Sequence, residues 1–341
     1  MGGCASAETP TQPTRIRRYP KSPSQYEIEK KGSFAKTEAG SFDGTAAYVF
    51  GARYRKTSTV LGKGTDAIVY QGIDCFTQRR VALKVTDLSA ENITPARRQE
   101  LTQRFRDEVN ILSSLDHPHV AQLLDFKEEI DKLTIVFEYA AGGDLLDYIT
   151  KVVKLDEADA RRLMVILVET LKYIHHSNVV HCDLKPDNIL LRSEEDVADV
   201  IITDFGFACF CNGNTLTRQL GSPNYIAPEV LLGVPYGAAV DIWALGVILY
   251  IMLLGCFPFY HTDPDILFNN IVFGQFSFRS EDISDEAKDL ICRMLIPDVS
   301  QRYTLDQILD HPWMNVPLVY KGVSERCESY KSSDNAHQFT F

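Results

Sequence analysis

The segment VVHCDLKPDNILL, residues 179–191, constrains the fold most, because it sets several polar side chains between apolar runs on both sides. Flanks rich in Val, Ile and Leu are typical of buried strands. Polar groups carried into a core need hydrogen-bond partners or a ligand. We therefore expect a strand, a polar loop and a second strand, with Asp183, Lys185 and Asn188 held together in the loop.

The uncharged run at residues 242–260 allows two interpretations. It reaches the length of about 18 residues at which a membrane span must be considered. A helix that is apolar all round fits either a membrane or the centre of a large core. Because Pro258 lies near its end and its flanks have soluble character, we interpret the run as a buried core helix.

The composition limits the class of protein. The chain has 341 residues, 45% hydrophobic and 24% charged, which is enough for one large domain or two lobes. A net charge of −11 argues against nucleic acid as a partner. Eight scattered cysteines, without a C-x-x-C pair or a secretory signal, suit reduced thiols and a cytoplasmic location.

The pattern along the chain predicts an α+β fold with a small β-rich lobe followed by a larger helical lobe. Residues 1–53 lack periodicity and are predicted to be a disordered basic arm. Beyond Tyr54 we expect strands within 57–74 and 79–88, a helix at 96–114, strands at 120–126 and 133–139, a hinge near 138–143, a helix at 156–176, and mostly helices after 227.

Three elements of the small lobe are candidates for binding a polyphosphate. In LGKGTDAIV, the missing side chains of Gly62 and Gly64 would let backbone N–H groups approach phosphates, although a plain hairpin turn explains this motif equally well. In VALK, Lys84 can pair with phosphate oxygens, and Glu108 on the next helix can hold it in place. The alternative for Lys84 and Glu108 is an ordinary surface ion pair.

The loop after residue 180 supplies the remaining chemistry. Asp183 can orient an attacking hydroxyl and accept its proton, and Lys185 can offset charge on a transferred phosphoryl group. Asn188 and Asp204 of the DFG motif can bind Mg²⁺. Any one motif alone could equally be a capped turn. Seven elements in the required order, with APE at 227–229 and DIWALG at 241–246, argue for a phosphoryl-transfer site.

On these motifs, residues 54–314 resemble a eukaryotic protein kinase catalytic domain, with residues 315–341 as a short C-terminal tail. Lys185 after HCDL resembles the serine/threonine class. The later patterns GQFSF, ISDEAKDLICRML, DVSQRYT and ILDHPWM resemble the calcium/calmodulin-dependent kinase group. The resemblance implies a bilobal fold and transfer of the γ-phosphate from ATP, with Mg²⁺, to serine or threonine of protein substrates.

The resemblance also implies further roles, residue by residue. It implies a serine that contacts the catalytic Asp and Lys, at Ser222, and a buried pair of Glu229 with Arg302. It implies a bulky gatekeeper at Phe137 and a ribose contact at Asp144. The implied nucleotide pocket has an adenine lining of Leu61, Val69, Ala82 and Leu190, with hinge hydrogen bonds at Glu138 and Ala140.

One part of the family pattern is missing. In many kinases an Arg precedes the catalytic Asp and binds a phosphorylated activation-loop residue, but here it is Cys182. Cys209 occupies the position of a second phosphate ligand, which is often a Lys, and Arg218 occupies the position of the usual phosphoacceptor. We therefore expect phosphorylation of Thr215 or Thr217 to activate little, because a phosphate charge of about −1.5 to −2 would be uncompensated there.

The same comparison predicts that Cys182 and Cys209 lie close together in the fold. Two interpretations stay open for them. They form a disulfide under oxidation, which requires Cα atoms within about 7 Å, or they are reduced thiols that fill the space of longer side chains. We also expect Arg218 to tie its loop to a nearby carboxylate, which would give activity without an upstream kinase.

The N-terminus MGGCAS fits the pattern for N-myristoylation at Gly2, with Cys4 beside it as a palmitoylation candidate. Residues 1–56 carry ten Lys and Arg against five Asp and Glu. A single acyl chain binds a membrane marginally and needs a second chain or a basic patch. We predict a peripheral membrane anchor, and the alternative is an ordinary disordered basic tail.

The substrate and regulator are only partly indicated. Asp187 and Asp144 match positions where basophilic relatives carry acids, which predicts a modest preference for basic residues N-terminal to the phosphoacceptor. Calmodulin is not supported by the tail, which lacks an EF-hand loop and a basic amphipathic helix. Our interpretation is a membrane-anchored protein kinase, and the alternative is a pseudokinase or nucleotide-binding scaffold.

Overall fold

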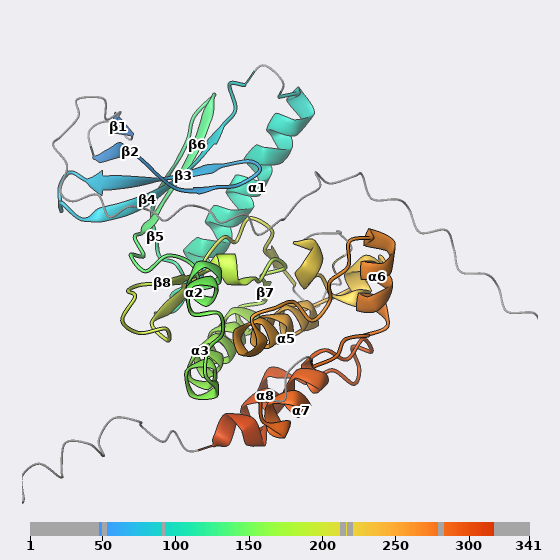
Figure 1. The fold of residues 1–341 in the computed structure, drawn as a ribbon. Coiled ribbons are helices and arrows are strands. Elements are labelled where there is room, and N and C mark those ends of the chain that lie inside the picture. The colour runs from blue at the N-terminus through green and yellow to red at the C-terminus, as the bar shows by residue number, and fades with distance from the viewer. Residues whose placement is uncertain are drawn as a thin grey trace, which may run out of the picture. The chain divides into compact units, whose positions relative to one another are not determined.

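The computed structural model describes residues 48–49, 53–90, 93–211, 216, 221–278 and 283–316. The predicted basic arm up to residue 47, with Gly2 and Cys4, lies outside the described residues, as does the tail from residue 317. The described elements begin with a sheet-rich N-terminal part and continue into a mainly helical C-terminal part (Figure 1).

The N-terminal part is a six-stranded antiparallel sheet with one helix beside it (Figure 1). The strand order is β1-β2-β3-β4-β6-β5. Helix α1 (Pro95–Ser114) begins where the Thr94 side chain accepts a hydrogen bond from the Arg97 N–H. The strands are β1 (Tyr48–Val49), β2 (Tyr54–Lys63), β3 (Ile68–Asp74), β4 (Arg80–Asp87), β5 (Leu123–Glu128) and β6 (Lys132–Glu138).

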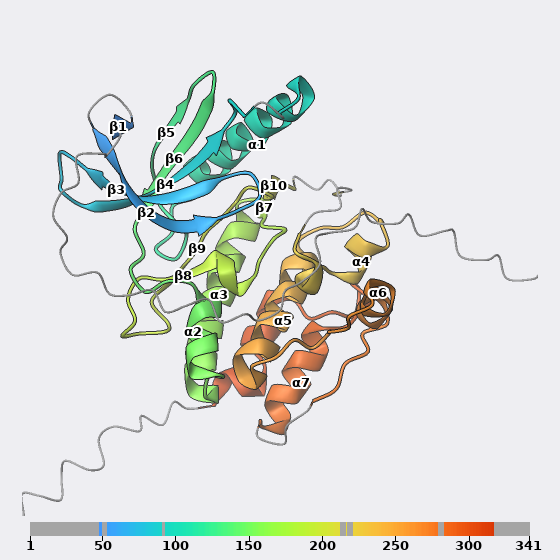
Figure 2. The ribbon, with the colours of Figure 1, turned by 45° about the horizontal axis from the view of Figure 1, so that its top comes forward.

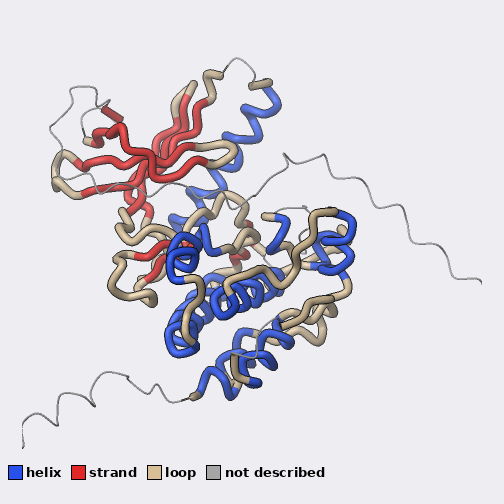
Figure 3. Tube along the Cα trace, viewed as in Figure 1, coloured by secondary structure: helices blue, strands red, loops and turns tan. Residues whose placement is uncertain are grey.

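The C-terminal part is built of helices, with two small strand pairs close to the sheet-rich part (Figure 3). The pairs are β7 (Val179–Val180) with β10 (Cys209–Phe210), and β8 (Ile189–Leu191) with β9 (Val200–Ile202). The α-helices are α2 (Leu145–Val152), α3 (Glu157–His176), α4 (Pro228–Leu231), α5 (Ala239–Leu254), α6 (Pro264–Val272), α7 (Asp285–Met294) and α8 (Leu305–Leu309).

Helix α5 is the centre of the helical part. Its residues from Val240 to Leu253 are all buried, and it packs on α3 and α7. The helix ends at Gly255, whose φ of 67° is left-handed and where an added Cβ would stand 2.4 Å from the Val153 carbonyl oxygen. The structure thus places the start of the uncharged run in a core. Within the described residues, no helix meets the length and hydropathy needed to cross a membrane.

The predicted fold class and element order are confirmed, with local differences. Helix α2 was not predicted, and β1 precedes the strand expected from Tyr54. The strand predicted at 120–126 begins later, because Val120 bridges to Ile202 and the Ala121 N–H donates to the Ile202 carbonyl at 2.9 Å. Those two residues therefore join the sheet-rich part to β9 instead of extending β5.

The segment predicted as a hinge, residues 138–143, follows β6 directly. The Gly142 N–H donates to the Leu191 carbonyl at 2.9 Å, and the Leu191 N–H donates to the Gly143 carbonyl at 2.9 Å. A Cβ on Gly142 would lie 2.6 Å from the Ser193 carbonyl oxygen, so only glycine permits this approach. The hinge is thereby fastened to β8, next to the polar loop.

Candidate active site

The polar loop between β7 and β8 is held by hydrogen bonds to one buried carboxylate on α5. Asp241 is 1% exposed, and it accepts the backbone N–H of His181 at 2.9 Å and that of Cys182 at 3.0 Å. The His175 Nε2 also lies 2.9 Å from Asp241. These hydrogen bonds outweigh the desolvation of the carboxylate and hold its pKa below the ordinary value. One side chain therefore fixes the start of the loop.

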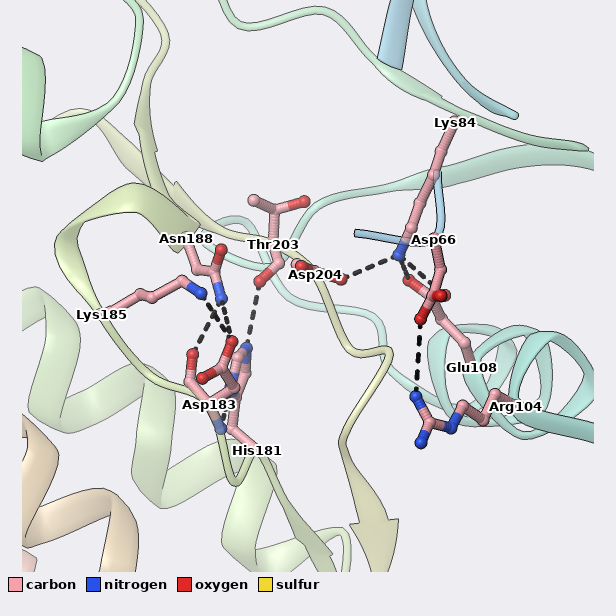
Figure 4. Close-up of polar contacts among 10 residues, drawn as sticks. All are labelled: Asp66, Lys84, Arg104, Glu108, His181, Asp183, Lys185, Asn188, Thr203 and Asp204. Atoms are coloured by element: carbon pink, nitrogen blue, oxygen red, sulfur yellow. Dashed lines mark hydrogen bonds and ion pairs between the residues drawn. The ribbon is translucent and has the colours of Figure 1, made fainter. Parts of the chain in front are cut away.

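His181 links the loop to Thr203, the residue between β9 and the DFG motif (Figure 4). It is fully buried, and its Nε2 lies 3.0 Å from the Thr203 carbonyl oxygen. A carbonyl can only accept, so Nε2 carries the proton and Nδ1 accepts the Asp183 N–H at 3.3 Å. The ring also packs on Phe205, with 4.8 Å between centroids. The loop and the DFG segment thus have a common support.

Asp183 is held by donors on both carboxylate oxygens. One oxygen accepts from Lys185 Nζ at 2.8 Å and from Asn188 Nδ2 at 3.3 Å. The other accepts from the backbone N–H and hydroxyl of Ser222, at 2.9 and 3.0 Å. The Lys185 Nζ donates to the Ser222 hydroxyl at 2.9 Å. The predicted contacts of Ser222 with the Asp and the Lys are therefore present.

Lys84 joins the two parts of the molecule (Figure 4). From β4, its Nζ donates to both carboxylate oxygens of Glu108 on α1, at 2.6 and 2.9 Å, and to Asp204 at 2.8 Å. Burial disfavours the ammonium, but the two carboxylates outweigh it and raise the pKa of Lys84. Lys84 in turn lowers the pKa of Asp204 to about 2. Both groups are charged at neutral pH.

The glycine-rich turn, residues 62–67, begins with Gly62 near the end of β2, continues through Gly64 to the start of β3, and is open on one side. A Cβ added to Gly62 would meet no atom within 4 Å, and one on Gly64 would meet only the Ala67 carbonyl oxygen, at 3.5 Å. Asp66, at the tip, forms an ion pair with Arg97 of α1. A second ion pair, of 3.7 Å, joins it to Arg104 of the same helix (Figure 4). These surface pairs tie the turn to the helix that carries Glu108.

The comparisons with known proteins agree with this geometry. The model of the protein kinase domain matches residues 55–314. The chain belongs to the protein kinase family. Its relatives place this kinase in the serine/threonine class, near the calcium/calmodulin-dependent group, so the enzyme class that the sequence predicted is confirmed.

Three relatives illustrate the match. The kinase is 36% identical over 297 residues to a phosphorylase b kinase gamma catalytic chain, liver/testis isoform, of Bos taurus, covering 84% of this chain and 70% of the relative. It is 39% identical over 259 residues to myosin light chain kinase A of Dictyostelium discoideum, at 74% and 85% coverage. It is 38% identical over 240 residues to a calcium/calmodulin-dependent protein kinase type 1 of Macrobrachium nipponense, at 70% and 68%.

The residues predicted to hold the adenine fit an apolar ring system. Each comes from a different strand or the hinge, and these side chains are only partly buried, which leaves apolar surface to cover. Leu61 is 39% exposed at the end of β2. Phe137 is buried in β6 opposite Ala82 of β4. The lining is completed by Val69 in β3 and Leu190 in β8.

The hinge offers backbone groups to a ligand of this kinase. The Ala140 N–H donates no hydrogen bond to another described residue. The Glu138 side chain is occupied, since its carboxylate accepts the Gln122 N–H at 3.0 Å and Arg192 Nε at 3.3 Å. Only the backbone of Glu138 is therefore a candidate for contact with a nucleotide. An unpaired donor beside an apolar lining fits the edge of an adenine ring.

Asn188 and Asp204 fit the oxygen chemistry of Mg²⁺. The Asn188 amide nitrogen donates to the Asp183 backbone carbonyl at 2.8 Å, so its amide oxygen is left as the ligand atom. Lys84 contacts one of the two oxygens of Asp204, whose side chain is 39% exposed. No group of three or more His, Cys, Asp or Glu within the described ranges suits a metal. Such a site needs phosphate oxygens to complete it.

Asp144 lies at the start of α2, where its carboxylate accepts the Asp147 N–H at 2.8 Å. Burial raises its pKa to about 6, with a further contribution from the charges of Asp147 and Asp187. The carboxylate is therefore poised to change charge just below neutral pH. It is close enough to Leu190 for a backbone bridge between the two residues.

Two further predicted contacts are present in the structure, and three predicted residues lie outside the described ranges. The buried Glu229–Arg302 pair is present, with two hydrogen bonds of 2.7 and 2.9 Å. The Sγ atoms of Cys182 and Cys209 lie 3.6 Å apart, so the predicted closeness is present too. Arg218, Thr215 and Thr217 fall outside the described residues, and the ideas about them stay predictions.

Sequence reasoning missed how two of these arrangements are held. Asp241 was recognised only as part of DIWALG, and its hydrogen bonds reach back 60 positions to His181. Asp66 was not singled out, although it lies in LGKGTDAIV, because the motif gives its carboxylate no role. Arg97 and Arg104 on the predicted helix gave only a weak signal, as basic residues about three turns and one turn before Glu108.

Proposed function

We propose that this serine/threonine kinase transfers the γ-phosphate of ATP to protein hydroxyls with Asp183 as the proton acceptor. The observation that carries the proposal is the set of bonds around Asp183. Its two oxygens are fixed by Lys185, Asn188 and Ser222 while the carboxylate stays 4% exposed. A fixed carboxylate at this place can orient a substrate hydroxyl and take its proton.

The other residues supply positive charge and metal ligands in this proposal. When bound, ATP supplies the phosphoryl group and Mg²⁺ offsets the charge of its oxygens. Lys84, held by Glu108, pairs with phosphate oxygens, and Lys185 offsets the charge that develops at the transferred group. Asp204 and Asn188 would hold Mg²⁺, and Gly62 and Gly64 leave room for phosphates beside the backbone.

A phosphotransfer assay on the full-length protein tests this function. Purified wild-type protein should phosphorylate a serine-containing protein such as casein in the presence of ATP and Mg²⁺. Asp183→Asn, which keeps the shape of the side chain but replaces one accepting oxygen with a donating amide, should lose transfer but keep nucleotide binding, as measured by a fluorescent ATP analogue. Nucleotide binding without transfer in the wild type would favour the scaffold alternative.

The substrate preference we propose is modest and directed to basic residues N-terminal to the phosphoacceptor. Asp144 and Asp187 lie at the start of α2 and in the loop after β7, close enough for their charges to interact. The two carboxylates would attract Arg or Lys of a peptide. A peptide array whose signal is indifferent to Arg and Lys at every upstream position would remove the proposal.

The location we propose is the cytoplasmic face of a membrane, with Gly2 myristoylated and Cys4 palmitoylated. Its support is the N-terminal motif and the basic residues that follow, under the rule that stable attachment needs two signals. In cell fractionation, Gly2→Ala should move the protein to the soluble fraction, and Cys4→Ser should weaken attachment. Full membrane retention of Gly2→Ala would place the anchor elsewhere.

A further inference from the structure

Two thiols meet between the catalytic loop and the segment that follows the DFG motif. The Sγ atoms of Cys182 and Cys209 lie 3.6 Å apart, although the residues are 27 positions apart in the chain. The strand pairing brings them together, because β10 lies antiparallel to β7 with Cys209 opposite Val180 (Figure 2). The contact is therefore set by the backbone of two paired strands.

We propose that Cys182 and Cys209 are a modification site, at which a peroxide converts the two thiols into a reversible disulfide. Its effect on phosphoryl transfer rests on the function proposed above, but the formation of the bond does not. A disulfide requires an S–S distance of about 2.05 Å, so the sulfur atoms must approach by about 1.5 Å. Side-chain rotation and a small backbone movement can supply this.

The movement falls mainly on Cys209. The backbone of Cys182 is fixed by the hydrogen bond from its N–H to buried Asp241 and by the packing of Gly221, where an added Cβ would lie 3.1 Å from the Cys182 carbonyl oxygen. Cys209 lies instead in a strand of two residues. The disulfide would thus draw β10 toward the catalytic loop and leave Asp183 in place.

The chemistry proceeds in two balanced steps. The hydrogen bond with Cys209 and burial raise the pKa of Cys182, so Cys182 remains a thiol at neutral pH. Hydrogen peroxide first transfers one oxygen to the sulfur of Cys209, giving a sulfenic acid and one water molecule. The sulfur of Cys182 then attacks that sulfur, loses its proton and displaces hydroxide, and the two leave as a second water molecule.

The disulfide would fasten the segment that begins at Asp204 to the loop that carries Asp183. Both carboxylates of the active site would then be tied through one covalent bond near the β7–β10 pair. Since Asp183 does not shift, we expect the oxidised kinase to keep its turnover, and to exchange the backbone amides of β10 more slowly. The disulfide therefore acts as a lock: it reduces the movement of β10 relative to the catalytic loop without changing the position of Asp183.

Peptide mapping of the full-length protein tests the proposal. The reduced protein is treated with hydrogen peroxide, alkylated and digested without reductant. We expect a linked peptide pair containing Cys182 and Cys209, two hydrogen masses below the sum of its parts, which disappears with dithiothreitol. Cys211→Ser is the matched control, because Cys211 is a second thiol two residues along the same segment, and its N–H pairs with the Asn178 carbonyl at 2.7 Å. That variant should still form the link, and Cys209→Ser should not.

Hydrogen–deuterium exchange provides the second measurement. Peroxide should slow amide exchange in the peptide that contains residues 209–211 of the wild type and of Cys211→Ser, and should leave it unchanged in Cys209→Ser. Recovery of Cys209 as a sulfinic acid, or linked to Cys211, overturns the proposal, and this result needs no variant to fold. A link without slower exchange overturns the lock. If the reduced wild type shows no phosphotransfer, the proposed function is contradicted, but the disulfide between Cys182 and Cys209 is not.

Discussion

The catalytic loop and the glycine-rich turn face the same site but are held in opposite ways. The loop is supported from within, since Asp241 is 1% exposed and Asp183 is 4% exposed, and each makes several hydrogen bonds. The turn is supported from outside, since the Asp66 side chain is 31% exposed and meets Arg97 and Arg104 at the surface.

The two kinds of support differ in how much free energy they contribute. Removing one partner from a buried, charged network leaves another group unpaired and costs about 3–5 kcal/mol. An exposed ion pair contributes only about 0–1 kcal/mol. The catalytic loop is therefore fixed before a substrate arrives, whereas the turn can adjust its position at little cost. The ion pair of Lys84 with Asp204 forms the junction between the sheet-rich part and the helical part.

Breaking that junction should have the largest effect. We expect Asp204→Ala and Lys84→Met each to lower kcat by about 10³-fold or more, because both groups act on phosphate charge. Lys84→Met also leaves the buried Glu108 without a cation, so its Tm should fall further than that of Asp204→Ala. Steady-state kinetics and thermal unfolding check this. Turnover like that of the wild type in either variant contradicts the mechanism.

Removing the internal support should come second. Asp241→Ala deletes the acceptor of His181, Cys182 and His175, so the loop loses its position, and kcat should fall by about 10²-fold. Urea unfolding should report a loss of about 3–5 kcal/mol. Asp241→Asn keeps one carboxamide oxygen and is the matched control, with an intermediate loss expected. An unchanged kcat in Asp241→Ala would mean that the loop is held by its flanking strands alone.

The pH dependence of substrate binding tests the role of Asp144 at the edge of the site. Asp144, with a pKa of about 6, is neutral below that pH and charged above it. The KM for a peptide with upstream Arg should therefore fall by several-fold as the pH rises from about 5 to 7. Measured KM values for Asp144→Asn should lack this change. A neutral peptide should show no such change even with the wild type.

Releasing the glycine-rich turn should have the smallest effect. Asp66→Asn removes the ion pairs but keeps the size of the side chain, so we expect the KM for ATP to rise by about two- to fivefold with kcat nearly unchanged. Asp66→Glu should restore most of the affinity. The difference from the wild type should shrink in about 1 M salt, where exposed charges are screened. A large fall in kcat would show that the turn is as rigid as the loop.

The sequence predicted those features whose signal is local. Lys84, Asp183, Asn188 and Asp204 were found because each sits in a short motif, and the order of the motifs defines the fold. The role of Asp241 was not predictable, because a carboxylate 60 positions away from His181 carries no local sign of its partner. The shift of β5 had the same origin, since Val120 and Ala121 bond to Ile202 across the chain. The ion pairs of Asp66 with Arg97 and Arg104 were not predictable either, because they depend on the backbone conformation of the turn.

The long separation between the catalytic loop and its anchor also bears on biosynthesis. The strands of the sheet pair largely with near neighbours in sequence, so the N-terminal part can begin to fold while the ribosome is still translating. The loop in residues 179–191, by contrast, lacks the carboxylate that holds it until Asp241 has left the ribosome, 60 residues after His181. A nascent chain stalled before that point would contain every residue of the catalytic loop but not the carboxylate that fixes its start, so we expect the loop to take up its position only after α5 has been made.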